Sequence, residues 1–247
     1  MRLLPTAILS WLLFGTMGTL SGIWAVLSIG RGEFLTAIAT VGVSAFCFGL
    51  VIPLVKVVRE TVTPHAAFDR AGTIFRPDRG IDIPIQISVL GLVVAAALVA
   101  VLAPLGKLDI PLPPFMRLSL PFVSALIVVT GVPMLWRNLR RGCTKYLRLT
   151  PDGFELSQGW RYQSDDWSQV ADVTKEVPGQ TAPTPATIVV VMSDGSTATI
   201  AGASFTPEGA ALRELVRFYW LHPDCRVELT DGRALKRLAE ERFEVGS

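Results

Sequence analysis

The sequence predicts a membrane α-helical bundle of four transmembrane helices, followed by a cytoplasmic α+β domain made mainly of antiparallel strands. Two observations predict this fold class. First, mean hydropathy is +0.46 and only 18% of residues are charged, whereas soluble domains carry about 25%. Second, four uncharged apolar stretches occupy the first 136 residues, and strand and turn patterns occupy the rest. These features disfavour a single soluble globule.

Each apolar stretch has about the 20 residues that cross a bilayer as a helix. The stretches cover residues 8–30, 34–55, 85–106 and 118–136. The first is interpreted as a retained span, because it is longer than the core of a secretory signal and no A-x-A cleavage site follows it. The last contains Pro121 and Pro133, which lie near its ends, where lost backbone hydrogen bonds are easiest to satisfy.

Lys and Arg near the span ends predict the direction of the chain. Eleven lie at the N-terminus, in the connector at 56–84 and at the exit from the last span, whereas three lie in the other loops. Positive residues concentrate in cytoplasmic loops. We therefore predict a multi-pass protein of the cell membrane, embedded in the lipid bilayer with its N- and C-termini in the cytoplasm.

Charge separates the two parts of the chain and excludes some functions. Residues 1–145 hold 13 Lys and Arg against 6 Asp and Glu, a net charge of +7, and residues 146–247 hold 10 against 15, a net charge of −5. The acidic part is a poor partner for nucleic acid, which needs a concentrated basic face. The spans lack the ionisable residues of pumps and ion-coupled transporters. A subunit of a transporter or channel complex stays open as the alternative function.

Small residues recur at a spacing of four along three of the spans. Small side chains at this spacing let helix backbones approach closely in a membrane. They are Gly18 and Gly22 in the first span, where Gly15 also lies three positions earlier, Ala45 and Gly49 in the second, and Gly91 and Ala95 in the third. Two interpretations are open: packing within the four-helix bundle, or a surface for a membrane-protein partner or a second copy in a homo-oligomer.

The region after residue 136 has the pattern of a small sheet closed by a helix. A basic juxtamembrane linker at 137–145 precedes expected strands at 146–150, 154–158, 160–164, 170–177, 187–192 and 197–200, with turns between them. Thr206 is the expected N-cap of a helix that ends at His222. A second short helix at 233–243 is charged on most faces and is expected at the edge of the domain.

Four segments of this region resemble the bacterial PH-like domain, as found in multi-span membrane proteins of actinobacteria. They are YLRLTPDGF at 146–154, DWSQV at 166–170, the strand and turn at 189–195, and FYWLHP at 218–223. The resemblance implies a bent antiparallel barrel over 146–226, capped by a C-terminal helix, with a tail at 227–247. Phosphoinositide-binding relatives clamp phosphates with several basic residues. The corresponding stretch here, at 157–161, holds only Arg161, so specific inositol-phosphate recognition is not expected.

The connector at 56–84 resembles the same domain more weakly, through FDRAGTIFR at 68–76 followed by DIP at 82–84. It is either a second partial PH-like hairpin, or a short hairpin that packs against the C-terminal domain and couples it to the spans.

Signatures of catalysis are missing, so we expect no enzyme activity and no cofactor or metal. The sequence has no GxGxxG, GxxxxGK[ST], GxSxG or HExxH motif, and its three cysteines are widely spaced. A basic cluster at the last span's exit is a candidate contact for anionic lipid headgroups. Its members are Arg137, Arg140, Arg141, Lys145 and Arg148. The expected function is that of a scaffold or accessory subunit, whose PH-like domain contacts a protein or the membrane surface.

Overall fold

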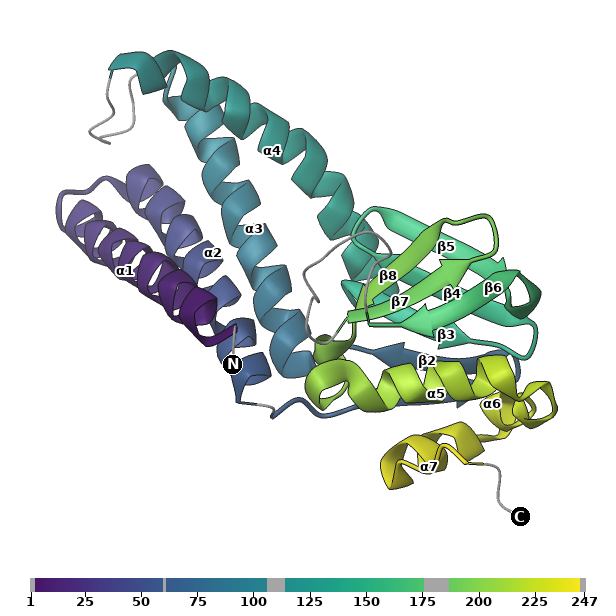
Figure 1. Cartoon of the computed structure of the whole chain (residues 1–247). Coiled ribbons are helices and arrows are strands. Elements are labelled where there is room, and N and C mark those ends of the chain that lie inside the picture. Colours follow the sequence, from purple (N-terminus) through teal and green to yellow (C-terminus); the bar gives the residue numbers. More distant parts are fainter. Residues whose placement is uncertain (1–2, 60, 106–113, 176–186, 245–247) are drawn as a thin grey trace. The chain divides into compact units, whose positions relative to one another are not determined.

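The computed structural model describes residues 3–59, 61–105, 114–175 and 187–244 (Figure 1). The chain forms two compact units, each built from two separate stretches of sequence. One comprises Met1–Val58 and Gly80–Gly142, and the other Arg59–Arg79 and Cys143–Ser247. The connector between the second and third spans therefore belongs with the C-terminal part of the chain, and not with the helices that flank it.

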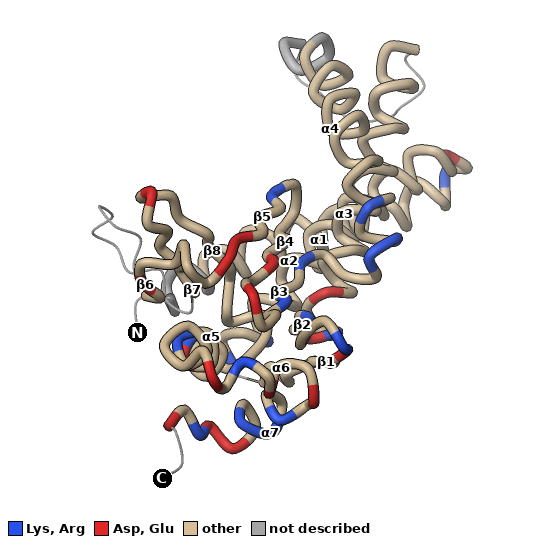
Figure 2. The backbone as a smooth tube through the Cα atoms, turned by 90° about the vertical axis from the view of Figure 1, so that its right-hand side faces the viewer, with Lys and Arg blue, Asp and Glu red and all other residues tan. Residues whose placement is uncertain are grey.

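The first unit contains four long helices, each apolar enough to cross a membrane. They are α1 (Leu3–Gly30), α2 (Phe34–Val58), α3 (Arg79–Leu102) and α4 (Pro114–Arg141). Figure 2 shows that charged residues lie near the ends of these helices and leave their middles uncharged. The four predicted spans are thus present as helices.

Several helix limits differ from the predicted span limits, and two of the differences involve charged residues. α3 begins at Arg79 and not at residue 85. Its first turn contains Asp82, a position where a carboxylate is favoured by the helix dipole, and Asp82 Oδ2 accepts a hydrogen bond of 2.8 Å from Gln86 Nε2. α4 continues to Arg141, so most of the predicted linker at 137–145 is helical. Arg140 and Arg141 stand in its last turn, where positive charge is also favoured.

The second unit contains two antiparallel sheets. The larger one has the order β1-β2-β3-β4-β5. Its strands are β1 (His65–Asp69), β2 (Gly72–Arg76), β3 (Lys145–Leu149), β4 (Gly153–Gln158) and β5 (Arg161–Asp166). The connector hairpin β1–β2 is joined to the rest because β2 pairs with β3, with Thr73 opposite Leu149 and Phe75 opposite Leu147.

The smaller sheet has the order β6-β7-β8, and a helix follows it. Its strands are β6 (Val170–Thr174), β7 (Thr187–Met192) and β8 (Thr197–Ala201). The predicted strands over 146–200 are confirmed to within a few residues at their ends, except that positions 176 and 177 of the strand expected at 170–177 lie outside the described residues. The described strands form two separate ladders, so they do not close the barrel that the family resemblance implies.

Three helices complete this unit: α5 (Ala210–Leu221), α6 (Glu228–Asp231) and α7 (Arg233–Glu240). α5 begins four residues after the predicted cap Thr206, because a 3-10 turn at Pro207–Gly209 intervenes. The Thr206 hydroxyl is buried and makes no hydrogen bond within the described structure. The end of α5 at His222 is as predicted.

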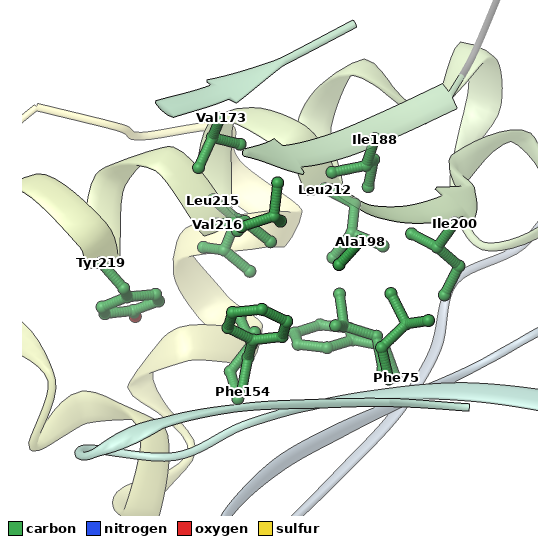
Figure 3. Close-up of a cluster of buried hydrophobic side chains, with 14 of the residues drawn as sticks. Phe75, Phe154, Val173, Ile188, Ala198, Ile200, Leu212, Leu215, Val216 and Tyr219 are labelled. Atoms are coloured by element: carbon green, nitrogen blue, oxygen red, sulfur yellow. The ribbon is translucent and has the colours of Figure 1, made fainter. Parts of the chain in front are cut away.

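One hydrophobic core joins both sheets to the helices (Figure 3). Phe75 and Phe154 project from the larger sheet, Ile188 and Ile200 from the smaller one, and Leu215 from α5. The C-terminal tail, which was expected at the edge of the domain, also contributes side chains to this core. The tail residues in the core are Leu229, Ala234 and Leu238, of which the first two are fully buried.

Candidate functional site

No group of three or more His, Cys, Asp or Glu side chains among the residues that the structure describes lies close enough to hold a metal ion. The two histidines each face a nearby carbonyl: His65 Nδ1 lies 3.0 Å from the Thr63 oxygen, and His222 Nδ1 lies 3.0 Å from the Phe218 oxygen. The three cysteines are free thiols.

Helices α2 and α3 touch through small residues. A Cβ built on Gly42 would lie 2.5 Å from the Gly91 carbonyl oxygen and 3.0 Å from Ala95 Cβ. In the other direction, a Cβ on Gly91 would lie 2.6 Å from the Gly42 oxygen and 3.1 Å from Ala45 Cβ. Both backbones therefore approach to a distance that excludes any side chain at these two glycines. Two turns further along α2, a Cβ on Gly49 would lie 2.5 Å from the Pro84 oxygen.

The small residues of α1 divide into two groups. A Cβ on Gly18 would lie 3.0 Å from Cys47 Cβ in α2, and one on Gly22 would lie 3.4 Å from Ser44 Oγ. The Ser44 hydroxyl also donates a 2.9 Å hydrogen bond to the Gly18 carbonyl, which ties α2 to α1. Gly15, in contrast, meets no described atom within 4 Å of its added Cβ. Six of the seven predicted small residues thus stand at helix contacts.

The predicted basic cluster is spread over two elements. Arg137, Arg140 and Arg141 lie on α4, where the Arg140 guanidinium stacks 4.6 Å from the centre of the Trp136 ring. Lys145 and Arg148 lie on β3 and have partners within the second unit. Lys145 Nζ donates a 2.7 Å hydrogen bond to Ser204 Oγ. These two residues therefore also bond within their own unit, a role that the charge pattern alone does not reveal.

Arg148 binds the connector hairpin through Asp69. Its Nη2 lies 2.9 Å from Asp69 Oδ1 and 2.7 Å from Oδ2. The Asp69 carboxylate also accepts the backbone N–H groups of Ala71 and Gly72 in the β1–β2 turn. The Ala71 hydrogen bond and then the Arg148 bond keep the pKa of Asp69 below its usual value. Sequence reasoning missed this pair, because its members stand 79 positions apart.

A further cluster, Tyr219, Glu228 and Arg237, fastens the tail to α5. Arg237 Nη2 and Nε donate hydrogen bonds of 2.8 and 2.9 Å to the two carboxylate oxygens of Glu228. The Tyr219 hydroxyl donates to Glu228 Oε2 at 3.1 Å. The guanidinium also lies 4.2 Å from the centre of the Phe218 ring. This side-on ion pair holds α6 and α7 against α5.

The pKa shifts in this cluster have clear causes. The Arg237 hydrogen bond holds the pKa of Glu228 below its ordinary value. Burial, followed by the charge of Glu228, raises the pKa of Tyr219. Because the Glu228 pKa is lowered on folding, its stabilising effect is complete above the unfolded pKa and is lost as pH falls through the folded pKa.

We expect Glu228→Gln to lower the free energy of unfolding of the second unit by about 1–3 kcal/mol at neutral pH, because a charge-assisted pair is lost. The variant should also lose less stability than the parent chain between neutral and acidic pH. Denaturant unfolding at several pH values measures both effects. The matched control is Glu240→Gln, which removes an exposed carboxylate that pairs with Lys236 and Arg242. Equal pH dependence in both variants would contradict the assignment.

Comparison with protein-family models, with curated proteins and with solved structures finds no match to this chain.

Proposed function

We propose that this chain is a non-enzymatic integral membrane protein that acts as a scaffold or accessory subunit. Its sheet-containing unit is a PH-like domain on the cytoplasmic side, available to a protein or to the membrane surface. One observation carries the proposal: the sheet of this domain is assembled from strands on both sides of α3 and α4. After β2 the chain therefore forms the two long apolar helices α3 and α4, and it then returns to the same sheet as β3.

This connection supports a role in holding or positioning other molecules. A domain attached to the spans by a single linker can move freely about that linker. Here β2 pairs with β3 although α3 and α4 lie between them in the sequence. The domain is therefore joined to the spans by more than one chain connection. The element order of two antiparallel sheets followed by α5 also supports the resemblance to a PH-like domain. The orientation proposed for it rests on the excess of Lys and Arg at 56–84 and 137–148.

The helical unit supports a second part of the proposal, an interaction within the membrane. In the apolar window of α4 only 6% of residues are buried, against 33% in α2. α4 therefore presents most of its apolar surface outward, as does much of α1, with 17% buried. Because lipid gives no hydrophobic drive for helix association, such a surface serves equally for lipid or for a packed partner helix.

Photo-crosslinking from α4 in the native membrane tests the scaffold proposal. A benzophenone amino acid is placed in turn at Phe122, Leu126 and Val129, which are 75%, 64% and 69% exposed. We expect at least one position to give a discrete protein adduct, either with a second copy or with another membrane protein. The control position is Val93, which is buried within the unit. Lipid adducts alone at all three positions would refute a partner on this helix.

A further inference from the structure

The larger sheet has one end at which the chain passes to and from the helices. β1 begins there at His65, β2 ends there at Arg76, and β3 begins there at Lys145. The register places His65 opposite Arg76 and Lys145 opposite Gln158, which pairs in turn with Arg161. We call these residues, together with the turn at 158–161, the connected end of the sheet.

Chain length limits how far this end can lie from the helices. Arg79, the first residue of α3, stands three positions after Arg76, and Lys145 stands four positions after Arg141, the last residue of α4. A fully extended chain covers at most about 3.6 Å per residue, so these links span at most about 11 and 14 Å. The hydrophobic core of a bilayer continues into interfacial layers of about 5–7 Å on each side. These two links therefore keep the connected end within about 11 and 14 Å of the helix ends at Arg79 and Arg141.

The two ends of the sheet differ in charge. Arg76, Lys145 and Arg161 give the connected end positive charge. The acidic residue next to it, Asp78, is only 1% exposed, and its Oδ2 accepts two hydrogen bonds from Thr63. The opposite end carries acidic residues in its turns and at the close of β5. They are Asp69, Asp152, Asp165 and Asp166, and the positive residues beside them are Arg70 and Arg148, of which Arg148 pairs with Asp69.

Exposed aromatic residues gather at the same connected end. Trp160, in the β4–β5 turn, is 57% exposed and Tyr162 is 55% exposed. Tyr146 faces Ser157, which faces Tyr162, so both tyrosines lie on the outer face of the sheet, opposite the core residues Leu147 and Leu156. The chain has three tyrosines, and two of them, Tyr146 and Tyr162, lie at the connected end.

We propose that the connected end of the sheet contacts the headgroup layer of the bilayer that holds the chain's own helices. The rings of Trp160 and Tyr162 enter the interface, and Arg161 meets anionic headgroups. Amphipathic aromatic rings favour this layer, and each basic residue near an anionic surface adds to the attraction. A single arginine in the turn suits general attraction to negative lipid, and not a clamp around one phosphate. The inference rests on the proposed function, in which this domain lies on the anionic cytoplasmic side.

Quenching of tryptophan fluorescence by brominated lipid tests the contact. The full chain is reconstituted into neutral phosphatidylcholine vesicles, and into vesicles that also contain phosphatidylglycerol, each with and without bromine on the acyl chains. The emission of Trp160 is obtained by subtracting the spectrum of Trp160→Phe from that of the parent chain. We expect brominated lipid to reduce this difference emission about twofold or more, as interfacial placement requires. The reduction should be larger in the anionic vesicles and should shrink in Arg161→Gln.

Trp220 provides the matched control. Its Nε1 donates a 3.1 Å hydrogen bond to the carbonyl of Val170, the first residue of β6. The chain reaches Val170 from the last residue of β5, which lies at the end of the sheet opposite to the connected end. The difference emission from Trp220→Phe should be insensitive to bromine. If the Trp160 emission is equally insensitive, the membrane contact is refuted. If it is quenched to the same extent in neutral and anionic vesicles, the role given to Arg161 is refuted. The crosslinking experiment on α4 probes the helical unit and detects protein adducts. The scaffold proposal and the headgroup contact can therefore fail independently of each other.

Discussion

Replacing Phe75 by alanine is expected to destabilise the second unit by about 3–5 kcal/mol, the cost of removing a buried aromatic side chain from a core. Phe75 belongs to the connector between the second and third spans, yet it is only 2% exposed and lies in the core with Phe154 (Figure 3). The same strand also contributes the Thr73 hydroxyl, which donates a 2.6 Å hydrogen bond to the Leu229 carbonyl of the tail. β2 is therefore an inner strand of this unit, and not an accessory to it.

Denaturant unfolding of the full chain in mild detergent measures this effect. Trp167 is a suitable reporter, since it is 2% exposed and its ring centre lies 5.9 Å from that of Phe154. Phe68→Ala is the matched control, because Phe68 lies on the same hairpin but is 52% exposed. We expect the control to cost less than about 1 kcal/mol, as surface substitutions do. Similar losses for both variants would show that the connector does not form part of this core.

Local patterns in the sequence were sufficient to predict most elements, because the signals that start and stop them are local. Strands β4 and β7 follow alternating or β-branched runs between turns, and the four apolar stretches define the long helices. The pairing of β2 with β3 is different. Two complete helices lie between Arg76 and Lys145 in the sequence. Nothing in the hairpin at 68–76 identifies the strand with which it pairs. Register between distant strands depends on a shared core, which a local pattern does not reveal.

The contacts of the tail and the partners of the basic cluster could not be predicted from the sequence for a related reason. The segment at 233–243 is charged on most of its surface, but Ala234 and Leu238 stand four apart and form a narrow buried stripe. Arg237 looks solvated in the sequence, and its role depends on Glu228, nine positions earlier. Arg148 likewise depends on Asp69. Charge counts predict where a chain meets a membrane, but they do not distinguish residues that face lipid from those that pair within the fold.

Six of the small residues named from the sequence stand at helix contacts, and Gly42 stands at one although it was not among them. Gly42 has no small residue four positions away to form the motif used for the others. It does stand three before Ala45 and seven before Gly49, so the three share one face of α2. Small residues spaced seven apart therefore predict a close helix contact as small residues spaced four apart do. Both spacings leave one helix face without large side chains.

Substituting leucine for Gly42 should disrupt the contact between α2 and α3. Its Cβ alone would lie 2.5 Å from the backbone oxygen of Gly91, and backbone cannot move aside as the end of a side chain can. Overpacking of this kind costs about 1–3 kcal/mol even where neighbours relax. We expect a lower thermal unfolding midpoint in detergent and a smaller yield of monodisperse protein. Gly15→Leu is the matched control, since it adds the same side chain to a span where no described atom lies within 4 Å.

The control separates two roles that small residues can play in a membrane. If both variants are equally destabilised, the loss comes from the helix itself or from its insertion, and the α2–α3 contact is not a source of stability. If only Gly42→Leu is affected, the close approach of two backbones is required within one copy of the chain. In that case Gly15, which faces outward, is the member of the predicted set that stays available for a neighbouring helix. The crosslinking approach used on α4 can then be extended to this face of α1.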